Sequence, residues 1–216
     1  FILAGDAAST LNPLSSFGIK KALTSAWLAA IVAHTVLTKP ECAISAAGFY
    51  SRWSTEIWQV NLQRSREFAR EARLRHPSAF WDAQAAISVD ESQLPLDESA
   101  LMAGADVHAA LARLRAADTI GFQAPDEETF VSTPIVRGDA LAIEPAVPLG
   151  PHPRDVVRYV LGVDLVALAR LAPCRDIPLM YERYTRAHGD VPLSSFLACL
   201  SLLLARGIVR EGAPIT

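Results

Sequence analysis

The chain has 216 residues, of which 51% are hydrophobic and 20% are charged, with a formal net charge of −3 and a pI of about 6.0. A chain of this length and composition can bury a core and does not have the composition of a disordered protein. The slight excess of acid argues against nucleic acid or an anionic membrane as the main partner. We see no signal peptide and no long uncharged apolar run, so we expect a cytoplasmic protein with no membrane span.

Three cysteines, Cys42, Cys174 and Cys199, lie far apart in the chain. They form no C-x-x-C pair and no Cys/His cluster, so we predict no metal site. An odd number of cysteines without a framework fits a reducing compartment, and we expect the three to be small buried hydrophobic residues.

The first residues, FILAGDAA, predict a β-strand over 1–4 that enters a tight turn at Gly5 and Asp6. A lone strand needs a sheet to pair with. We therefore expect the chain to be a piece of a longer protein whose sheet is encoded upstream, or a piece that docks on another chain.

Two long helices should follow. Between 18 and 37 the apolar residues recur at spacings of three and four, which predicts one apolar stripe on a helix that Pro40 ends; the stripe holds Ile19, Ala22, Leu23, Ala26, Trp27, Ala30, Ile31 and Leu37. A second helix is predicted over 43–75. Its later half, QRSREFAREARLR, is charged and typical of a solvated face.

The middle of the chain is less regular. Pro77 breaks the helical pattern, SVDESQLPLDES predicts a loop, and 100–117 predicts a shorter helix. Six prolines between 121 and 153 predict a connector, in which TFVSTPIV is a candidate strand.

The last segment predicts a compact helical module. PRDVVRYVLGVDLVALARLA suggests one or two short helices, and a further helix should begin at Asp176 as N-cap and end at Gly189. A last helix should have Pro192 near its first position and Gly207 just past its end, before a strand in IVREG. Three helices and a strand resemble a small winged-helix module. Its third helix is mostly leucine with one Arg at its far end, so we favour a packing or protein-contact role over the reading of DNA bases.

The stretch GDAASTLNPLSSFGIKKAL carries the chemistry that we can identify. Asp6 follows a glycine at the predicted strand end, where a carboxylate can accept hydrogen bonds from sugar-like hydroxyls. Pro13 stiffens the approach to a helix at Gly18, whose first N–H groups and partial positive charge suit an anionic ligand. Ser15 and Ser16 add hydroxyl donors. From the residues alone, this is a loop-to-helix anion site beside a carboxylate, a combination that also arises by chance.

The same stretch resembles the second FAD-binding motif of the flavin-dependent monooxygenases of the para-hydroxybenzoate hydroxylase type. The variant NPLSSFGI is similar to the flavin-dependent halogenase branch, and to related flavoproteins that modify residues to build quinone cofactors in partner proteins. The Arg-rich helix followed by HPSAFW is also similar to this branch. The resemblance covers about residues 1–85 and is specific over 5–30.

This resemblance implies an FAD site. Asp6 would contact the ribityl chain of the flavin, and the loop from Pro13 to Ile19 would approach its pyrimidine end. Backbone N–H groups near Gly18 and Ile19 would stabilise negative charge on reduced flavin. In halogenases this loop lies beside a halide, which makes Ser15, Ser16 and Gly18 the halide-side candidates. The implied cofactor-binding residues are Gly5, Asp6, Pro13, Ser15, Ser16, Gly18 and Ile19, and no catalytic residue can be assigned.

Two departures stand against the resemblance. Asn12 occupies the position before the proline where the family has Asp, and the family's first motif, G-x-G-x-x-G, is absent from the chain. The halogenases' catalytic lysine also lies upstream, and we interpret Lys20 and Lys21 as solvated or helix-capping residues.

We therefore expect an α/β, mostly helical fragment: the C-terminal part of an FAD-binding Rossmann-like flavoprotein over 1–125, a Pro-rich connector over 126–153 and a winged-helix-like module over 154–216. The expected function is FAD-dependent oxidation, of the monooxygenase or halogenase type, of a small aromatic substrate or of a residue on a partner protein, with a halide as a further partner. The alternative is a non-catalytic helical interaction module that has lost flavin binding. A winged-helix regulator is a third, minor interpretation.

Overall fold

The computed structural model describes residues 1–11, 17–116, 120–172, 174 and 176–212. These residues divide into two compact units, and we treat each separately. The first comprises residues 1–95 and 134–144, and the second comprises 96–133 and 145–216. The expected boundaries near 125 and 153 stay a prediction.

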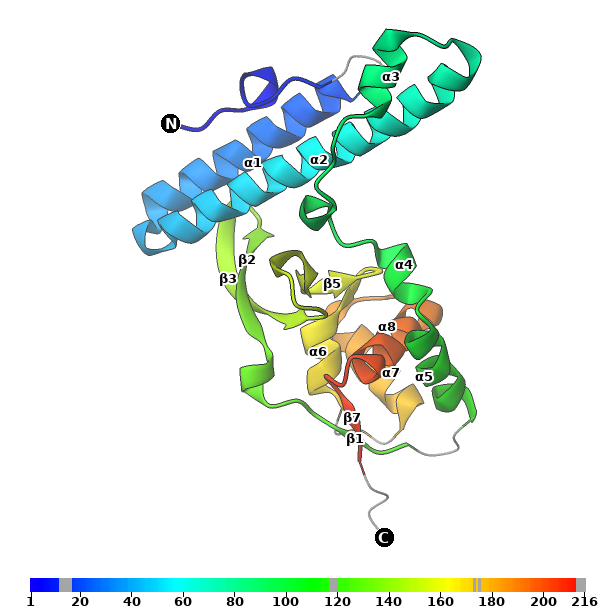
Figure 1. The fold of residues 1–216 in the computed structure, drawn as a ribbon. Coiled ribbons are helices and arrows are strands. Elements are labelled where there is room, and N and C mark those ends of the chain that lie inside the picture. The colour runs from blue at the N-terminus through cyan, green and yellow to red at the C-terminus, as the bar shows by residue number, and fades with distance from the viewer. Residues whose placement is uncertain (12–16, 117–119, 173, 175, 213–216) are drawn as a thin grey trace. The chain divides into compact units, whose positions relative to one another are not determined.

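The first unit is built around a helical hairpin. Helices α1 (Gly18–Thr38) and α2 (Ala43–Arg75) lie side by side, joined by the short 3-10 turn η3 (Pro40–Cys42) (Figure 1). Helix α3 (Ala79–Ala85) packs back on α2, after the chain breaks at Pro77 and Ser78 caps the new helix by accepting a hydrogen bond from the Trp81 N–H. The turns η1 (Gly5–Ala7) and η4 (Glu91–Gln93) complete this unit. The two long helices begin and end within one residue of the sequence prediction.

The apolar stripe predicted on α1 is only partly buried. Ile19, Leu23 and Trp27 are 80%, 69% and 54% exposed, whereas the buried positions include Leu28, Ile31 and Val32. The small core of this unit joins Ile31, Val32 and Ala46 to Leu141 of a later strand. Helix α1 is apolar on more than one side, so the hydrophobic spacing alone could not select the buried face. By length and composition α1 could also cross a membrane, a property that the core helix of a soluble protein can share.

The segment 1–4 does not form the predicted strand. Ala4 is extended, but within the described residues no strand is assigned there, and the chain turns directly into η1. A strand requires a neighbouring strand to satisfy its backbone groups, and local β propensity does not supply one.

Strands β2 (Val131–Arg137) and β3 (Ala140–Pro148) flank a tight turn in which Gly138 has a φ of +62°. They form a three-stranded sheet with β4 (Val156–Val157), which pairs antiparallel with β3. The predicted strand in TFVSTPIV corresponds to β2. Strand β3 was not predicted. Two prolines in its EPAVP segment led us to interpret this region as a connector.

The second unit has the larger core. Besides β4 it contains short paired strands and several helices, with β1 (Phe122–Gln123) paired to β7 (Arg210–Glu211) and β5 (Tyr159–Val160) paired to β6 (Val163–Asp164). Its helices and 3-10 turns are α4 (Glu98–Met102), α5 (Ala105–Ala116), η5 (Glu127–Thr129), η6 (Pro153–Asp155), α6 (Leu165–Arg170), α7 (Ile177–His188) and α8 (Leu193–Ala205).

Helix α8 lies in this core and packs against α5. Its fully buried side chains include Phe196, Leu200, Leu202 and Leu203, as its leucine-rich sequence indicates. Asp176 caps α7 and Gly207 takes a φ of +67° after α8, as predicted. The winged-helix assignment is not tested by these elements and stays a prediction.

Candidate functional site

The Gly5–Asp6 turn is fixed against α1 by its backbone. The Gly5 N–H donates a hydrogen bond to the Ser25 Oγ at 2.8 Å, and Gly5 has a φ of +60°, a conformation that favours glycine. A Cβ at this position would lie 3.4 Å from the Ala22 Cβ. That distance is an ordinary van der Waals contact, so it is the backbone conformation of the turn that favours glycine here.

Tyr50 of α2 holds the segment that precedes the turn. Its hydroxyl donates to the Leu3 carbonyl at 2.7 Å and also lies 3.4 Å from the Ser25 carbonyl. Burial raises the pKa of Tyr50, opposed by a hydrogen bond with Ser54, so the phenol remains a donor. Neither this tether nor the role of Ser25 is predicted by the sequence, because both depend on contacts between residues far apart in the chain.

Asp6 presents its carboxylate outward from the turn. Its side chain is 73% exposed, and one carboxylate oxygen lies 4.0 Å from the Lys21 Nζ. The carboxylate is therefore free of short ion pairs among the described residues and can accept hydrogen bonds from a ligand. Because Lys21 lies on α1, the contact also places Asp6 close to the first turns of that helix.

Helix α1 begins at Gly18 without a polar cap. Phe17 occupies the N-cap position, and within the described residues no acidic side chain lies in the first turn, which instead carries Lys20 and Lys21. A Cβ added to Gly18 would meet nothing within 4 Å, so the space beside its backbone is open. The partial positive charge of the helix end favours an anionic group here.

The structure therefore brings together four of the seven predicted cofactor residues: Gly5 and Asp6 on the turn, and Gly18 and Ile19 at the start of α1. Ile19 is mostly exposed. Pro13, Ser15 and Ser16 lie outside the described residues. The interpretation of Lys21 as a solvated lysine is wrong, because it is only 6% exposed.

An apolar groove of about 920 Å³ lies along the other end of the hairpin. It is lined by the first residues of the chain and by facing positions of α1 and α2, among them Leu3, Ala29, Ala33, Tyr50 and Ser54. Most of its surface is apolar, with Tyr and Ser hydroxyls as the polar groups. A groove of this kind suits an apolar group better than a charged one.

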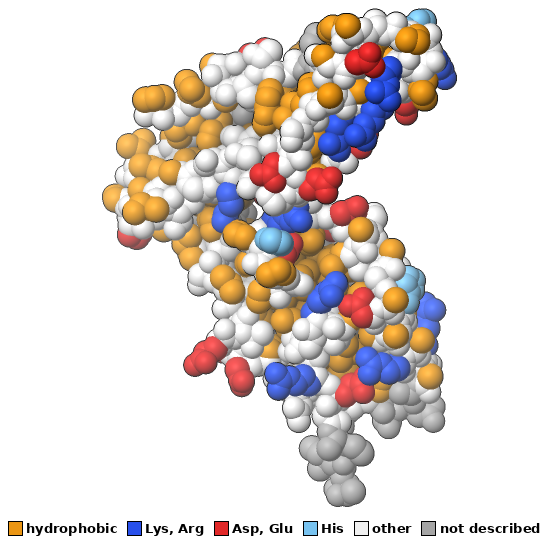
Figure 2. Space-filling view, viewed as in Figure 1, with side chains coloured by type: hydrophobic (Ala, Val, Ile, Leu, Met, Phe, Trp, Pro, Cys, Tyr) orange, Lys and Arg blue, Asp and Glu red, His pale blue; other side chains and the backbone are white. Residues whose placement is uncertain are grey.

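The second half of α2 carries the basic residues predicted from its sequence. These basic residues are all arginines, and basic side chains gather there beside hydrophobic ones in Figure 2. Trp81 of α3 packs edge-on against Phe68 and Phe80, with ring centroids 5.9 and 4.8 Å apart. These aromatic residues therefore join α3 to α2.

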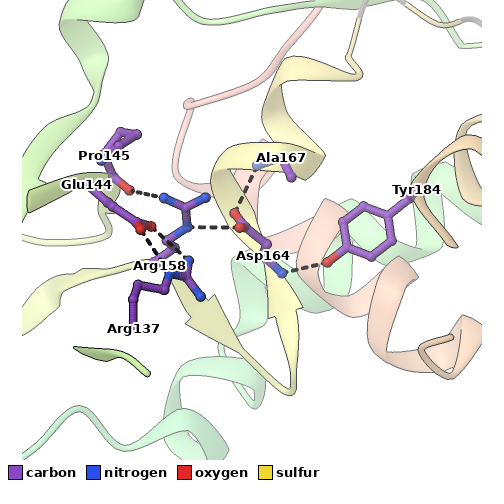
Figure 3. Close-up of polar contacts among 7 residues, drawn as sticks. All are labelled: Arg137, Glu144, Pro145, Arg158, Asp164, Ala167 and Tyr184. Carbon is purple, nitrogen blue, oxygen red and sulfur yellow. Dashed lines mark hydrogen bonds and ion pairs between the residues drawn. The ribbon is translucent and has the colours of Figure 1, made fainter. Parts of the chain in front are cut away.

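The second unit contains a largely buried polar network. Arg158 donates to the Asp164 carboxylate at 2.8 Å, and the same carboxylate caps α6 by accepting from the Ala167 N–H (Figure 3). The Asp164 N–H donates to the Tyr184 hydroxyl at 2.7 Å. Every polar group in this chain of contacts has a partner, which is typical of a structural network that fixes β6 and α6.

No group of His, Cys, Asp and Glu suited to a metal ion occurs in the described parts of the chain. Cys199 is buried, whereas Cys42 and Cys174 are half-buried. The expectation of three buried cysteines is thus correct for one of them.

Comparison with known proteins identifies a fold but no family. No family model matches the chain, and no curated protein matches it. A solved structure, the peptidyl tryptophan dihydroxylase QhpG, described as essential for tryptophylquinone cofactor biogenesis, matches with a TM-score of 0.52 at 20% sequence identity. The match covers 94% of this chain and 40% of that one.

This match corrects the family resemblance drawn from the sequence. The protein of similar fold is a peptidyl tryptophan dihydroxylase, and nothing supports membership of the monooxygenase and halogenase family. The halogenase assignment is therefore withdrawn, whereas the role of Ser15, Ser16 and Gly18 beside a halide is not tested and stays a prediction. The chain spans less than half the length of the protein whose fold it shares.

Proposed function

We propose that the chain is part of an FAD-dependent oxidoreductase that oxidises an aromatic residue of a partner protein. The observation that carries the proposal is the Gly5–Asp6 turn, held against the uncapped start of α1, within a fold shared with a peptidyl tryptophan dihydroxylase. The likeness supports the type of reaction and of substrate, and the turn supports the cofactor.

The residues present fit the flavin. Asp6 has an exposed carboxylate that can accept hydrogen bonds from ribityl hydroxyls, and the close packing of Gly5 on Ala22 keeps that carboxylate near α1. The open space at Gly18 leaves the backbone of the first helical turn accessible. FAD would supply the redox chemistry of the reaction.

The chain's own residues would bind and orient the cofactor. Asp6 would fix the ribityl chain, and the N–H groups at Gly18 and Ile19 would donate to the oxygen and nitrogen atoms of the flavin pyrimidine ring. The partial positive charge at the start of α1 would favour the reduced, anionic cofactor over the neutral one. We assign no catalytic residue.

The reaction is tested by incubating the full-length protein with FAD, a reductant, oxygen and a peptide containing tryptophan. We expect mass spectrometry to find oxygen added to the tryptophan side chain, with a phenylalanine-for-tryptophan peptide as the control that gains none. A protein that binds FAD but leaves every such peptide unchanged would contradict the substrate class. A protein that ignores FAD would instead support the alternative, a helical interaction module that has lost flavin binding.

A further inference from the structure

A second, smaller cavity lies between α1 and α2 and is not part of the flavin proposal. Its volume is about 190 Å³, and its polar lining residues include Lys20 and Lys21 of α1 with Asn61 and Arg64 of α2. Space of this size can hold several water molecules or a small ion. Lys21 and Asn61 are buried, whereas Lys20 and Arg64 are exposed.

Lys21 is the first unusual feature of this cavity. Its side chain is only 5% exposed, and its Nζ has no hydrogen-bond partner among the residues that the structure describes. Asp6 lies 4.0 Å away, but that carboxylate is largely solvated and beyond hydrogen-bond distance. A buried ammonium without partners is costly, so its presence calls for an anionic ligand.

Asn61 is the second unusual feature of this cavity. It is 5% exposed, and its amide nitrogen donates to the Ile57 carbonyl of its own helix at 2.8 Å. Its side-chain oxygen is buried and lacks a donor within the described residues. The same cavity is therefore lined by one buried donor that lacks an acceptor and one buried acceptor that lacks a donor.

Lys20 and Arg64 add positive charge to the lining. The Lys20 ammonium and the Arg64 guanidinium lie 5.4 and 4.8 Å from the centre of the Phe17 ring, which holds both near the cavity. Phe17 also lines the cavity. Three cations around one small space favour a ligand with more than one negative charge.

We infer that this cavity binds hydrogen phosphate, free or as the terminal group of a phosphate monoester. Its charged oxygens would accept hydrogen bonds from Lys21, Lys20 and Arg64, and its P–OH group would donate to the Asn61 oxygen. Sulfate has the charge but no proton to donate, and acetate has neither the second charge nor the donor. The match of donors and acceptors, rather than charge alone, selects the ligand.

The test is isothermal titration of the chain with inorganic phosphate, sulfate and acetate at constant ionic strength, with phosphoserine as the monoester. We expect phosphate to bind more tightly than sulfate and acetate to bind weakest. Lys21→Met keeps the aliphatic chain and should weaken phosphate binding at least tenfold. Lys39→Met, a lysine that does not line the cavity, is the matched control and should leave it unchanged.

Asn61→Leu should reduce phosphate affinity to that of sulfate, because only phosphate uses the Asn61 oxygen. Should Lys21→Met fail to fold, Arg64→Gln at an exposed position provides the second variant, with a severalfold loss expected. Phosphate binding that survives Lys21→Met or Arg64→Gln unchanged would overturn the inference, as would phosphate binding no tighter than that of sulfate. Binding of phosphoserine but not of inorganic phosphate would assign the site to monoesters.

Discussion

At the scale of single residues, Gly5 is a position where one added methyl group should have a cost, because its φ is +60°. Gly5→Ala would force a side chain into a left-handed conformation, at about 1–2 kcal/mol, and place its Cβ 3.4 Å from that of Ala22. We expect a loss of stability of at least this size in chemical denaturation.

Gly48→Ala is the matched control. Gly48 lies inside α2 and a Cβ there would meet nothing within 4 Å, so this variant should gain about 0.5–1 kcal/mol. Equal effects at the two glycines would show that the turn is not held against α1 as described.

Cys199 illustrates burial acting on a titratable group. Burial raises the pKa of its thiol from 9.0 to about 12, so the protonated form is favoured in the folded chain. Its contribution to stability is complete below pH 9 and is lost as the pH rises from about 9 towards 12. At pH 8 we expect a disulfide reagent to label Cys42 and Cys174 in the native protein, and Cys199 only after unfolding.

Cys199→Ala identifies the protected thiol. The variant should lose the cysteine that reacts only in denaturant and keep the two that react natively. Rapid native labelling of all three cysteines in the parent chain would contradict the burial of Cys199.

At the scale of elements, Thr35 joins helix α1 to strand β3. Its buried hydroxyl accepts a hydrogen bond from the Leu141 N–H and donates one to the Ile31 carbonyl, both at 2.8 Å. Thr35→Val keeps the shape but leaves the Leu141 N–H without its acceptor, which should cost about 1–3 kcal/mol in the free energy of unfolding.

Thr38→Val is the control one turn later. The Thr38 hydroxyl is exposed and donates only to the helical carbonyl of His34, so its removal should change stability by less than about 0.5 kcal/mol. If the two threonines proved equivalent, the link between α1 and β3 would have no energetic role.

The same elements show what the sequence could predict. The bounds of α1 and α2 followed from apolar spacing and from Pro40 and Pro77, because local signals decide where helices begin and end. The buried face of α1 could not be predicted in this way, because it is oriented by hydrogen bonds to distant parts of the chain. Ser25 bonds to Gly5, 20 residues away, and Thr35 bonds to Leu141, 106 residues away. The burial of Lys21 and the pairing of β3 are likewise long-range.

For the candidate site, the motif placed Gly5, Asp6, Gly18 and Ile19 correctly at a turn and a helix start. The tethers that hold the turn, Ser25 and Tyr50, carried no recognisable motif. The hydrogen-bond partner of a serine or tyrosine in a helix cannot be read from its sequence, because the partner comes close only in the folded chain.

At the scale of the whole molecule, we propose that the Gly5–Asp6 turn and the start of α1 form part of a flavin site. The chain matches only 40% of a protein with a similar fold, so the cofactor must be sought in the full-length polypeptide. Asp6 is largely exposed, and its loss should affect cofactor binding far more than folding.

The most direct measurement is the visible absorption spectrum of the full-length protein after incubation with FAD and removal of unbound cofactor. We predict retained flavin bands in the parent and in Asp139→Ala, a control at an exposed aspartate, and at least a tenfold weaker affinity for FAD in Asp6→Ala. A colourless parent protein, or an Asp6→Ala variant that retains FAD as firmly as the parent, would contradict the account.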